Sequence, residues 1–97
     1  MEVSSGSFSW EDRKEAENIL KHGIDFSTAS RAFFDPKRKI CKDSKHSHSE
    51  ERLFCIGSVG GKVMTVRFTY RGQKIRIIGA GYWRKGGRHY DGENNDG

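Results

Sequence analysis

Residues 51–80 alternate between apolar and polar side chains, a period of two that is typical of strands with one buried face. Gly60-Gly61 and Arg71-Gly72 interrupt the alternation where tight turns between neighbouring strands are expected. Antiparallel strands need only such short connections. The segment therefore predicts an antiparallel meander. The predicted strands, with an exposed loop at 43–50, are 37–42, 51–59, Met64 to Tyr70, and 74–80.

Two helices are expected ahead of this meander, after a short edge strand at Phe8-Ser9-Trp10. Ser9 and Asp12 have the spacing of a capping box at the start of the first helix, and Asp35-Pro36 stops the second. The predicted buried stripe of the first helix comprises Ala16, Ile19, Leu20 and Gly23. The predicted buried stripe of the second comprises Phe26, Ala29, Ala32 and Phe33.

The predicted fold class is therefore α+β, with two N-terminal helices packed on an antiparallel meander of about four strands. A short C-terminal helix or partly ordered segment is expected at 82–90, because each glycine of Gly86-Gly87 costs roughly 0.8–1 kcal/mol in a helix. One domain is expected over residues 8–90, with residues 1–7 and 91–97 as disordered tails. Helices on one face of the sheet leave the other face to solvent or a ligand.

The chain is strongly basic. Its 97 residues have a formal charge of +5, and the last seven hold three acidic residues and no cation. Residues 1–90 thus have 18 basic and 10 acidic side chains, a charge of +8. Such a domain attracts polyanions, so nucleic acid is the first expected partner. Solubility or an acidic protein partner is the alternative explanation.

The remaining composition favours a cytoplasmic protein. Cys41 and Cys55 lie in strand-like segments without Cys-x-x-Cys spacing, which favours reduced thiols over a disulfide. No apolar run approaches the ~18 residues of a membrane span, and the first seven residues do not resemble a signal peptide. No membrane association is expected.

Lys21-His22-Gly23 places two cationic or titratable side chains at the predicted end of the first helix. One interpretation is structural, because Gly23 suits a left-handed C-cap and cations there offset the helix dipole by ~0.3–1 kcal/mol. The other is functional, since His22 and Lys21 could act on a bound phosphate. Glu50-Glu51-Arg52 has the same two interpretations, a surface ion-pair cluster or a carboxylate beside an arginine at the rim of the sheet.

Two further segments have the groups that bind RNA. Pairing through the Arg71-Gly72 turn is expected to place Arg67 opposite Lys74 and Arg76 opposite Thr65, which makes a cationic sheet face for phosphate or for solvent alone. Residues 82–90 interleave aromatic and cationic side chains, the pattern with which proteins stack bases and contact phosphates. Packing of Trp83 on the sheet is the alternative. The predicted RNA-binding residues are Arg67, Lys74, Tyr82, Arg84, Lys85 and Arg88.

No metal or other cofactor is expected. His46 and His48 lie in the predicted loop, and two ligands on a loop are too few for a zinc site. RNA cleavage without a metal ion requires a base, an acid and cations that stabilise charge on phosphate. His22 or Glu51 is the candidate base, and His22 or Tyr82 the candidate acid. The candidate charge stabilisers are Lys21, Arg52, Arg76 and Arg84.

Short motifs occur in one consistent order from residue 8 to about residue 90. They are Phe8-x-Trp10-Glu11-Asp12, Lys21-His22-Gly23-Ile24-x-Phe26, Phe33-x-Asp35-Pro36, Glu50-Glu51-Arg52 and Ile75-Arg76-Ile77-Ile78, then Arg84, Arg88 and Tyr90. In this combination the chain resembles the BrnT family of bacterial ribonuclease toxins. The resemblance implies a compact fold like that of RelE-type toxins and RNA cleavage that blocks translation. It also implies a cognate antitoxin with a ribbon-helix-helix DNA-binding part. The catalytic residues that it implies are Lys21, His22, Glu51, Arg52 and Arg76, with Arg84 in addition.

One departure from the family pattern lies at the end of the last predicted strand. Many members have Ile-Ser-Ala-Arg where this chain has Ile78-Gly79-Ala80-Gly81. If the replaced arginine is catalytic, either activity is weak or Arg84 has its role. The sequence therefore predicts a metal-independent endoribonuclease toxin of a type II toxin–antitoxin pair that inhibits translation. The alternative is a catalytically weak RNA- or protein-binding module of the same fold.

Overall fold

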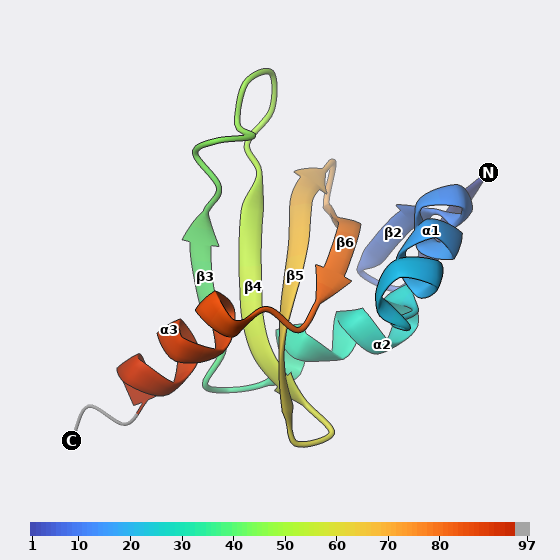
Figure 1. The fold of residues 1–97 in the computed structure, drawn as a ribbon. Helices are drawn as coiled ribbons and strands as arrows, with labels where there is room; N and C mark the ends of the chain where they lie inside the picture. Colours follow the sequence, from blue (N-terminus) through green and yellow to red (C-terminus); the bar gives the residue numbers. More distant parts are fainter. Residues whose placement is uncertain (95–97) are drawn as a thin grey trace.

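A six-stranded sheet forms the centre of the structure, a computed structural model that describes residues 1–94 (Figure 1). The strand order is β1-β2-β6-β5-β4-β3, and every neighbouring pair is antiparallel except β2 and β6, which are parallel. The strands are β1 (Glu2–Ser5), β2 (Phe8–Glu11), β3 (Lys39–Lys42), β4 (Leu53–Val59), β5 (Lys62–Arg71) and β6 (Lys74–Gly81). The helical elements are α1 (Asp12–His22), α2 (Phe26–Ser30), the 3-10 helix η1 (Arg31–Phe34) and α3 (Arg84–Asn94).

The predicted fold class, two N-terminal helices on a meander of about four strands, is wrong. The chain begins with a β1-β2 hairpin, and the parallel pairing of β2 with β6 makes the sheet mixed. Residues 1–7 were expected to be a disordered tail, but residues 2–5 form β1. Gly6, at φ +59°, allows the turn that folds this segment back on β2. The small polar residues of β1 have no apolar alternation, so the pattern did not indicate a strand.

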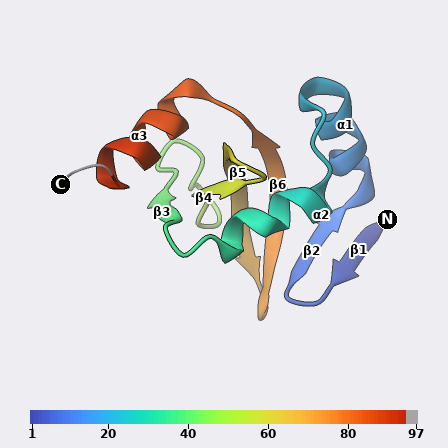
Figure 2. The same ribbon diagram turned by 90° about the horizontal axis from the view of Figure 1, so that it is seen from below.

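The helices lie on both faces of the sheet. Figure 2 shows α2 and α3 on opposite sides of β4 and β5. On the α2 side, the rings of Phe33 and Phe68 meet with centroids 4.9 Å apart, and Gly57 lies so close to η1 that a Cβ there would be 2.4 Å from the carbonyl oxygen of Ala32. Burial of each large apolar side chain here stabilises the fold by roughly 1.5–3 kcal/mol. The core consists of Phe8, Trp10, Ile24, Phe26, Ala29, Ala32, Cys55, Val59, Met64, Val66, Phe68, Ile77 and Ala80.

Helix α1 contacts the sheet through polar side chains, so its predicted apolar stripe is wrong. Ile19 and Leu20 are 46% and 87% exposed, whereas Asn18 is buried. The Asn18 amide donates to the carbonyl of Ile24 and accepts from the backbone N–H of Ala80, both at 3.0 Å. Ser9 lies in β2 rather than in a capping box. The second helix is as predicted, because α2 and η1 bury Phe26, Ala29 and Ala32 and end before Asp35.

Helix α3 packs against the opposite face of the sheet through a glycine. A Cβ on Gly86 would lie 2.1 Å from Oγ1 of Thr65, so this close approach requires glycine. The far part of the helix is held by the Tyr90 hydroxyl, which donates to Oδ2 of Asp35 at 2.6 Å. The helix continues to Asn94, beyond the expected start of the C-terminal tail at residue 91. The rest of that predicted tail, residues 95–97, lies outside the described residues.

The register of β5 and β6 differs from the predicted pairing. Arg67 lies opposite Gly79, and Arg76 lies opposite Thr69. Gly72, at φ +62°, and Gln73 form the turn between the two strands. The prediction placed the turn one position earlier, at Arg71-Gly72. An irregularity between Arg67 and Phe68 shifts the register again. These two local features separate Arg67 from Lys74 along the hairpin.

Candidate nucleic-acid interface

The predicted catalytic residues divide into two groups at opposite ends of β6. Lys21 and His22 end α1, which Asn18 fastens to Ala80 near the end of the strand. Glu51 lies near the start of β6, because the Thr69 hydroxyl donates to its carbonyl oxygen at 2.5 Å and Thr69 pairs with Arg76. Gly81 lies five positions after Arg76, a distance of about 16 Å at a strand rise of about 3.3 Å per residue. The two groups therefore cannot act on one phosphate in this conformation.

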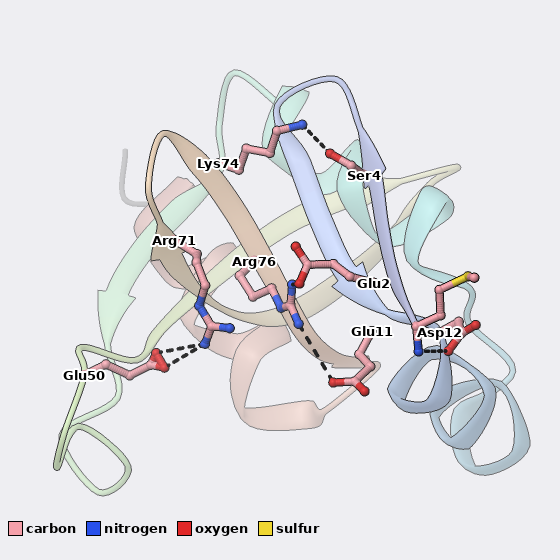
Figure 3. Close-up of polar contacts among 9 residues, drawn as sticks. Glu2, Ser4, Glu11, Asp12, Glu50, Arg71, Lys74 and Arg76 are labelled. Carbon is pink, nitrogen blue, oxygen red and sulfur yellow. Dashed lines mark hydrogen bonds and ion pairs between the residues drawn. The ribbon is translucent and has the colours of Figure 1, made fainter.

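Arg76, the central cation of the second group, is paired with two carboxylates (Figure 3). Its Nη1 lies 2.8 Å from Oε1 of Glu2, and its Nη2 lies 3.9 Å from Oε2 of Glu11. Only 8% of the residue is exposed. The hydrogen bond from Arg76, together with its charge, holds the pKa of the Glu2 carboxyl below its usual range. Glu2 therefore stays ionised near neutral pH and offsets the charge of Arg76.

The other cations near this end of β6 also have partners (Figure 3). Glu50 pairs with Arg71 at 3.1 Å and with Arg52 at 4.0 Å. The Lys74 ammonium donates to Oγ of Ser4 and, at 2.9 Å, to the carbonyl of Gly6. The surface ion-pair interpretation of Glu50-Glu51-Arg52 thus agrees with the contacts of Glu50. Glu51 is exposed.

At the other end of β6, His22 contacts Trp83. The two ring centroids are 5.2 Å apart, with planes inclined at 68°. Gly23 adopts the left-handed C-cap expected of it, at φ +68°, and its N–H donates to the carbonyl of Ile19. Lys21 and His22 are both exposed in the last turn of α1. The imidazole is therefore accessible at the start of the segment that leads into α3.

A groove of about 710 Å³ lies between α3 and the sheet, and Trp83 is one of its lining residues. Its polar lining includes two of the predicted RNA-binding residues, Arg67 and Lys85. Arg84 and Arg88 are exposed on α3 outside this lining, and Tyr82 is half exposed with the Lys62 ammonium 5.4 Å from its ring centroid. The groove is lined by Cys41, Lys42, Phe54, Ile56, Thr65, Arg67, Trp83, Lys85, Gly86 and His89.

The cations of the groove differ from those near Arg76 in their partners. Within the described part of the chain, no carboxylate lies within ion-pair distance of Arg67, Lys42 or Lys85. The buried Nε of Arg67 has no hydrogen-bond acceptor there, a property that it shares with Nε of Arg52 and Nη1 of Arg76, so the difference between the two groups lies in the carboxylates alone. Cations without a counter-ion attract phosphate more strongly than cations already paired with carboxylates. The groove is therefore the stronger candidate for binding an anionic polymer.

Two further properties of the chain concern metal binding and membrane crossing. Among residues 1–94, no group of three or more His, Cys, Asp and Glu side chains is placed to hold a metal ion. His46 Nδ1 instead lies 2.8 Å from Oδ2 of Asp43 in the β3-β4 loop. In the same range, no helix is both long and apolar enough to cross a membrane.

Sequence reasoning missed several residues around these two sites. Glu2 and Glu11 were not connected with Arg76, because the pairing depends on the unexpected β1-β2 hairpin. Phe54 and His89 were not expected to share a groove with Arg67. Pairing of β4 with β5 through the predicted Gly60-Gly61 turn places Phe54 opposite Arg67, so this neighbour could have been inferred from the sequence.

A mixed sheet with a cationic groove on one face and an accessible histidine beside it defines a small basic protein suited to bind a polyanion. The chain belongs to the family described as the ribonuclease toxin, BrnT, of type II toxin-antitoxin systems, whose model matches residues 10–86. This confirms the resemblance found in the sequence motifs. No curated protein gives a significant sequence match. Membership of a type II system implies an antitoxin partner.

Proposed function

We propose that this chain cleaves single-stranded RNA without a metal ion and that the RNA lies in the groove between α3 and the sheet. The observation that most supports this site is a set of cations along the groove, Arg67, Lys42 and Lys85, that have no carboxylate partner among the residues that the structure describes. The half-exposed ring of Trp83 also lines the groove and contacts His22. Aromatic and cationic groups in one groove match what single-stranded RNA requires, namely base stacking and phosphate contact.

The proposed reaction is attack of the RNA 2′-hydroxyl on the adjacent phosphorus. A bond forms between O2′ and phosphorus, the bond from phosphorus to O5′ breaks, and the products are a 2′,3′-cyclic phosphate and a 5′-hydroxyl. His22 removes the 2′ proton, and Tyr82, which follows β6, gives a proton to O5′. Lys21 and the groove cations stabilise the charge that develops on the phosphate.

His22 is preferred to Glu51 as the base because of position. Glu51 lies near Thr69 and Arg76, about 16 Å along β6 from Gly81. His22 contacts Trp83, which lines the groove. Arg52 and Arg76 lie with Glu51, too far from His22 to act on the same phosphate, and each is close to a carboxylate. They are proposed to contact another phosphate of the strand, which requires that RNA displace Glu50 or Glu2.

The test of the reaction is product analysis with a matched substrate. A single-stranded RNA and the same strand with 2′-deoxyribose at the cleaved position are incubated with the purified chain in excess EDTA. The proposal expects a 2′,3′-cyclic phosphate from the RNA and no cleavage of the deoxy-substituted strand. Cleavage of both strands would contradict it, because hydrolysis by water does not use the 2′-hydroxyl.

We further propose that RNA cleavage in the cytoplasm inhibits translation and that a cognate antitoxin with a ribbon-helix-helix DNA-binding part covers this cationic face. Residues 1–90 have 18 basic and 10 acidic side chains. The partner surface is therefore expected to be acidic, since like charges across an interface are costly. Induction of the chain in bacteria should stop amino-acid incorporation, and co-expression of the antitoxin should restore it. Continued incorporation after induction of the folded chain would contradict this part of the proposal.

A further inference from the structure

Two glycines on β6 leave room for side chains that come from other elements. A Cβ on Gly79 would lie 2.8 Å from Nη2 of Arg67. A Cβ on Gly81 would lie 2.6–2.8 Å from three atoms of the Trp83 six-membered ring. Contacts this short require a neighbouring group to move, so a side chain at residue 79 would displace the guanidinium and one at residue 81 would displace the indole. Arg67 and Trp83 can therefore lie directly on the backbone of β6 only because residues 79 and 81 are glycines.

The two glycines place the guanidinium and the indole next to each other. Residues two apart on a strand point to the same face and are about 7 Å apart. Gly79 pairs with Arg67 and Gly81 pairs with Thr65, and both Arg67 and Thr65 line the groove. Trp83 lines it as well. The guanidinium and the indole thus lie against two positions of β6 that face the same side and are about 7 Å apart along the strand.

The charge of Arg67 is available to a ligand. Its Nε is buried without a hydrogen-bond acceptor, and within the described residues no carboxylate lies within ion-pair distance. Phe54, which pairs with Arg67 across β4 and β5, also lines the groove, so the surroundings of the guanidinium are partly apolar. Phosphate is the ligand group that a guanidinium binds best through its two parallel N–H donors.

The indole of Trp83 is available to a base. The residue is 42% exposed, although one side of the ring lies against Gly81 and the imidazole of His22 approaches it at 68°. A half-exposed indole in a cationic groove is the arrangement on which proteins stack the bases of single strands.

We propose that Trp83 and Arg67 together bind one nucleotide of single-stranded RNA, with the base stacked on the indole and the neighbouring phosphate bound by the guanidinium. Gly79 and Gly81 determine this site, because any side chain at either position displaces one of the two binding groups. The choice of RNA as the ligand rests on the proposed function. The site itself rests on the contacts of the two glycines.

The experiment measures binding apart from cleavage. The probe is a fluorescein-labelled 2′-O-methyl oligonucleotide, which lacks the attacking hydroxyl, and the readouts are anisotropy and quenching of tryptophan emission. Trp10 is 4% exposed, so quenching by the oligonucleotide reports on Trp83. The variants are Trp83→Leu, Arg67→Gln and Gly79→Ser, and Trp83→Phe keeps an aromatic ring. Arg31→Gln, a change of equal charge at an exposed residue on η1, is the matched control.

Trp83→Leu is expected to weaken binding about 10-fold, with an unchanged dependence on salt, and Trp83→Phe to restore most of the affinity. Arg67→Gln is expected to weaken binding and to reduce the slope of log affinity against log salt by ~0.7, the value for one single-strand phosphate contact. Gly79→Ser is expected to weaken binding less than Arg67→Gln, because the guanidinium is displaced from the backbone of β6 but keeps its charge. Arg31→Gln is expected to bind within about twofold of the parent.

Quenching in the unmodified chain, together with these losses, supports the site. Absence of quenching in the unmodified chain, or parental affinity in folded Trp83→Leu and Arg67→Gln variants, would overturn it. The proposed function fails in a different way, since an unmodified chain that does not cleave RNA in EDTA can still bind the 2′-O-methyl strand through Trp83 and Arg67. Conversely, if the chain cleaves RNA but the Trp83 and Arg67 variants bind the oligonucleotide as tightly as the parent, the proposed site is wrong and the proposed ribonuclease activity stands.

Discussion

Nη1 of Arg76 lies 2.8 Å from Oε1 of Glu2, so an arginine of the central sheet is paired with a carboxylate from the first strand of the chain. Glu2 lies outside the segment that matches the family model, which begins at residue 10, whereas Arg76 lies inside it. The first strand therefore places a negative charge beside a cation that the sequence motifs assign to RNA. Glu2 and an RNA phosphate would compete for the same guanidinium.

Glu2→Gln is expected to raise affinity for a non-cleavable RNA strand because the competing charge is removed. If Arg76 gains one phosphate contact, the salt dependence steepens by ~0.7. Glu17→Gln is the matched control, since Glu17 is exposed on α1 and its carboxylate lies 3.8 Å from Nε of Arg13, a longer separation than that of Glu2 from Arg76. Adding Arg76→Gln to Glu2→Gln should cancel the gain. If the affinity for RNA rises by the same small factor in Glu2→Gln and in Glu17→Gln, Arg76 does not bind phosphate.

The two adjacent glycines of α3 are expected to respond to alanine in opposite directions. Gly86→Ala places a Cβ 2.1 Å from Thr65 Oγ1 and should lower the free energy of unfolding, because the helix must move off the sheet. Gly87 has no atom within 4 Å of its Cβ position, so Gly87→Ala should raise the free energy of unfolding by up to about 1 kcal/mol through helix propensity. Urea unfolding of both variants measures the difference. Stabilisation by both substitutions would contradict the observed packing of α3.

Helix α1 offers a test of its polar contact with the sheet. Asn18→Ala leaves the N–H of Ala80 and the carbonyl of Ile24 without their partner and should cost about 1–3 kcal/mol of stability. Leu20→Gln should change stability by no more than about 0.5 kcal/mol, because the side chain is 87% exposed. Thermal unfolding of the two variants decides between this arrangement and the apolar stripe predicted from the sequence. A larger loss in Leu20→Gln than in Asn18→Ala would favour the stripe.

Tyr90 and Asp35 give stability a defined dependence on pH. The hydrogen bond to Asp35, with burial, raises the pKa of Tyr90 to about 12. Burial acts to raise the pKa of Asp35, but hydrogen bonds from Tyr90 and from the N–H of Ser58 outweigh it and hold that pKa below its usual value. The Tyr90 contribution is thus complete below its unfolded pKa of 10.0 and is lost as pH rises toward about 12. The Asp35 contribution is complete above its unfolded pKa of 3.8 and is lost as pH falls below it.

Tyr90→Phe is therefore expected to lower the free energy of unfolding by about 1 kcal/mol near neutral pH. The difference from the parent chain should shrink both in acid, where Asp35 is protonated, and in strong alkali. Urea unfolding as a function of pH measures both limbs. A difference between the two chains that stays constant as pH falls through the Asp35 titration would contradict the assignment.

The local parts of the fold could be predicted from the sequence because their signals are local. The alternation of β4 and β5, the glycine turns and the short α2-η1 segment each depend on neighbouring residues. The β1 strand could not be predicted, since its residues have no apolar period and its pairing with β2 is what orders it. The inward face of α1 was misjudged because Asn18 is buried through hydrogen bonds, which a hydrophobic pattern does not indicate.

The candidate site was less predictable than the fold. The sequence indicated Arg67, Lys85 and the aromatic segment at 82–90, but their common groove depends on α3 packing on Thr65 through Gly86. Gly86 was interpreted as a weakness of the helix, whereas it is the position that allows the helix to approach the sheet. The separation of His22 from Glu51 depends on the pairing of β5 with β6, and the predicted register of that pair was wrong.

The central claim is that RNA in the groove is cleaved with His22 as the group that moves a proton. The most direct measurement is the rate of cleavage of single-stranded RNA in excess EDTA by the parent chain and by His22→Ala, together with the affinity of each for a 2′-O-methyl strand. The account predicts cleavage by the parent, a loss of about 10²-fold or more in His22→Ala, and nearly equal affinities. A role for His22 only at the helix end predicts at most about 1 kcal/mol of lost stability and no change in rate. Parental cleavage by a folded His22→Ala chain, or cleavage by the parent only after a divalent ion is added, would contradict the account.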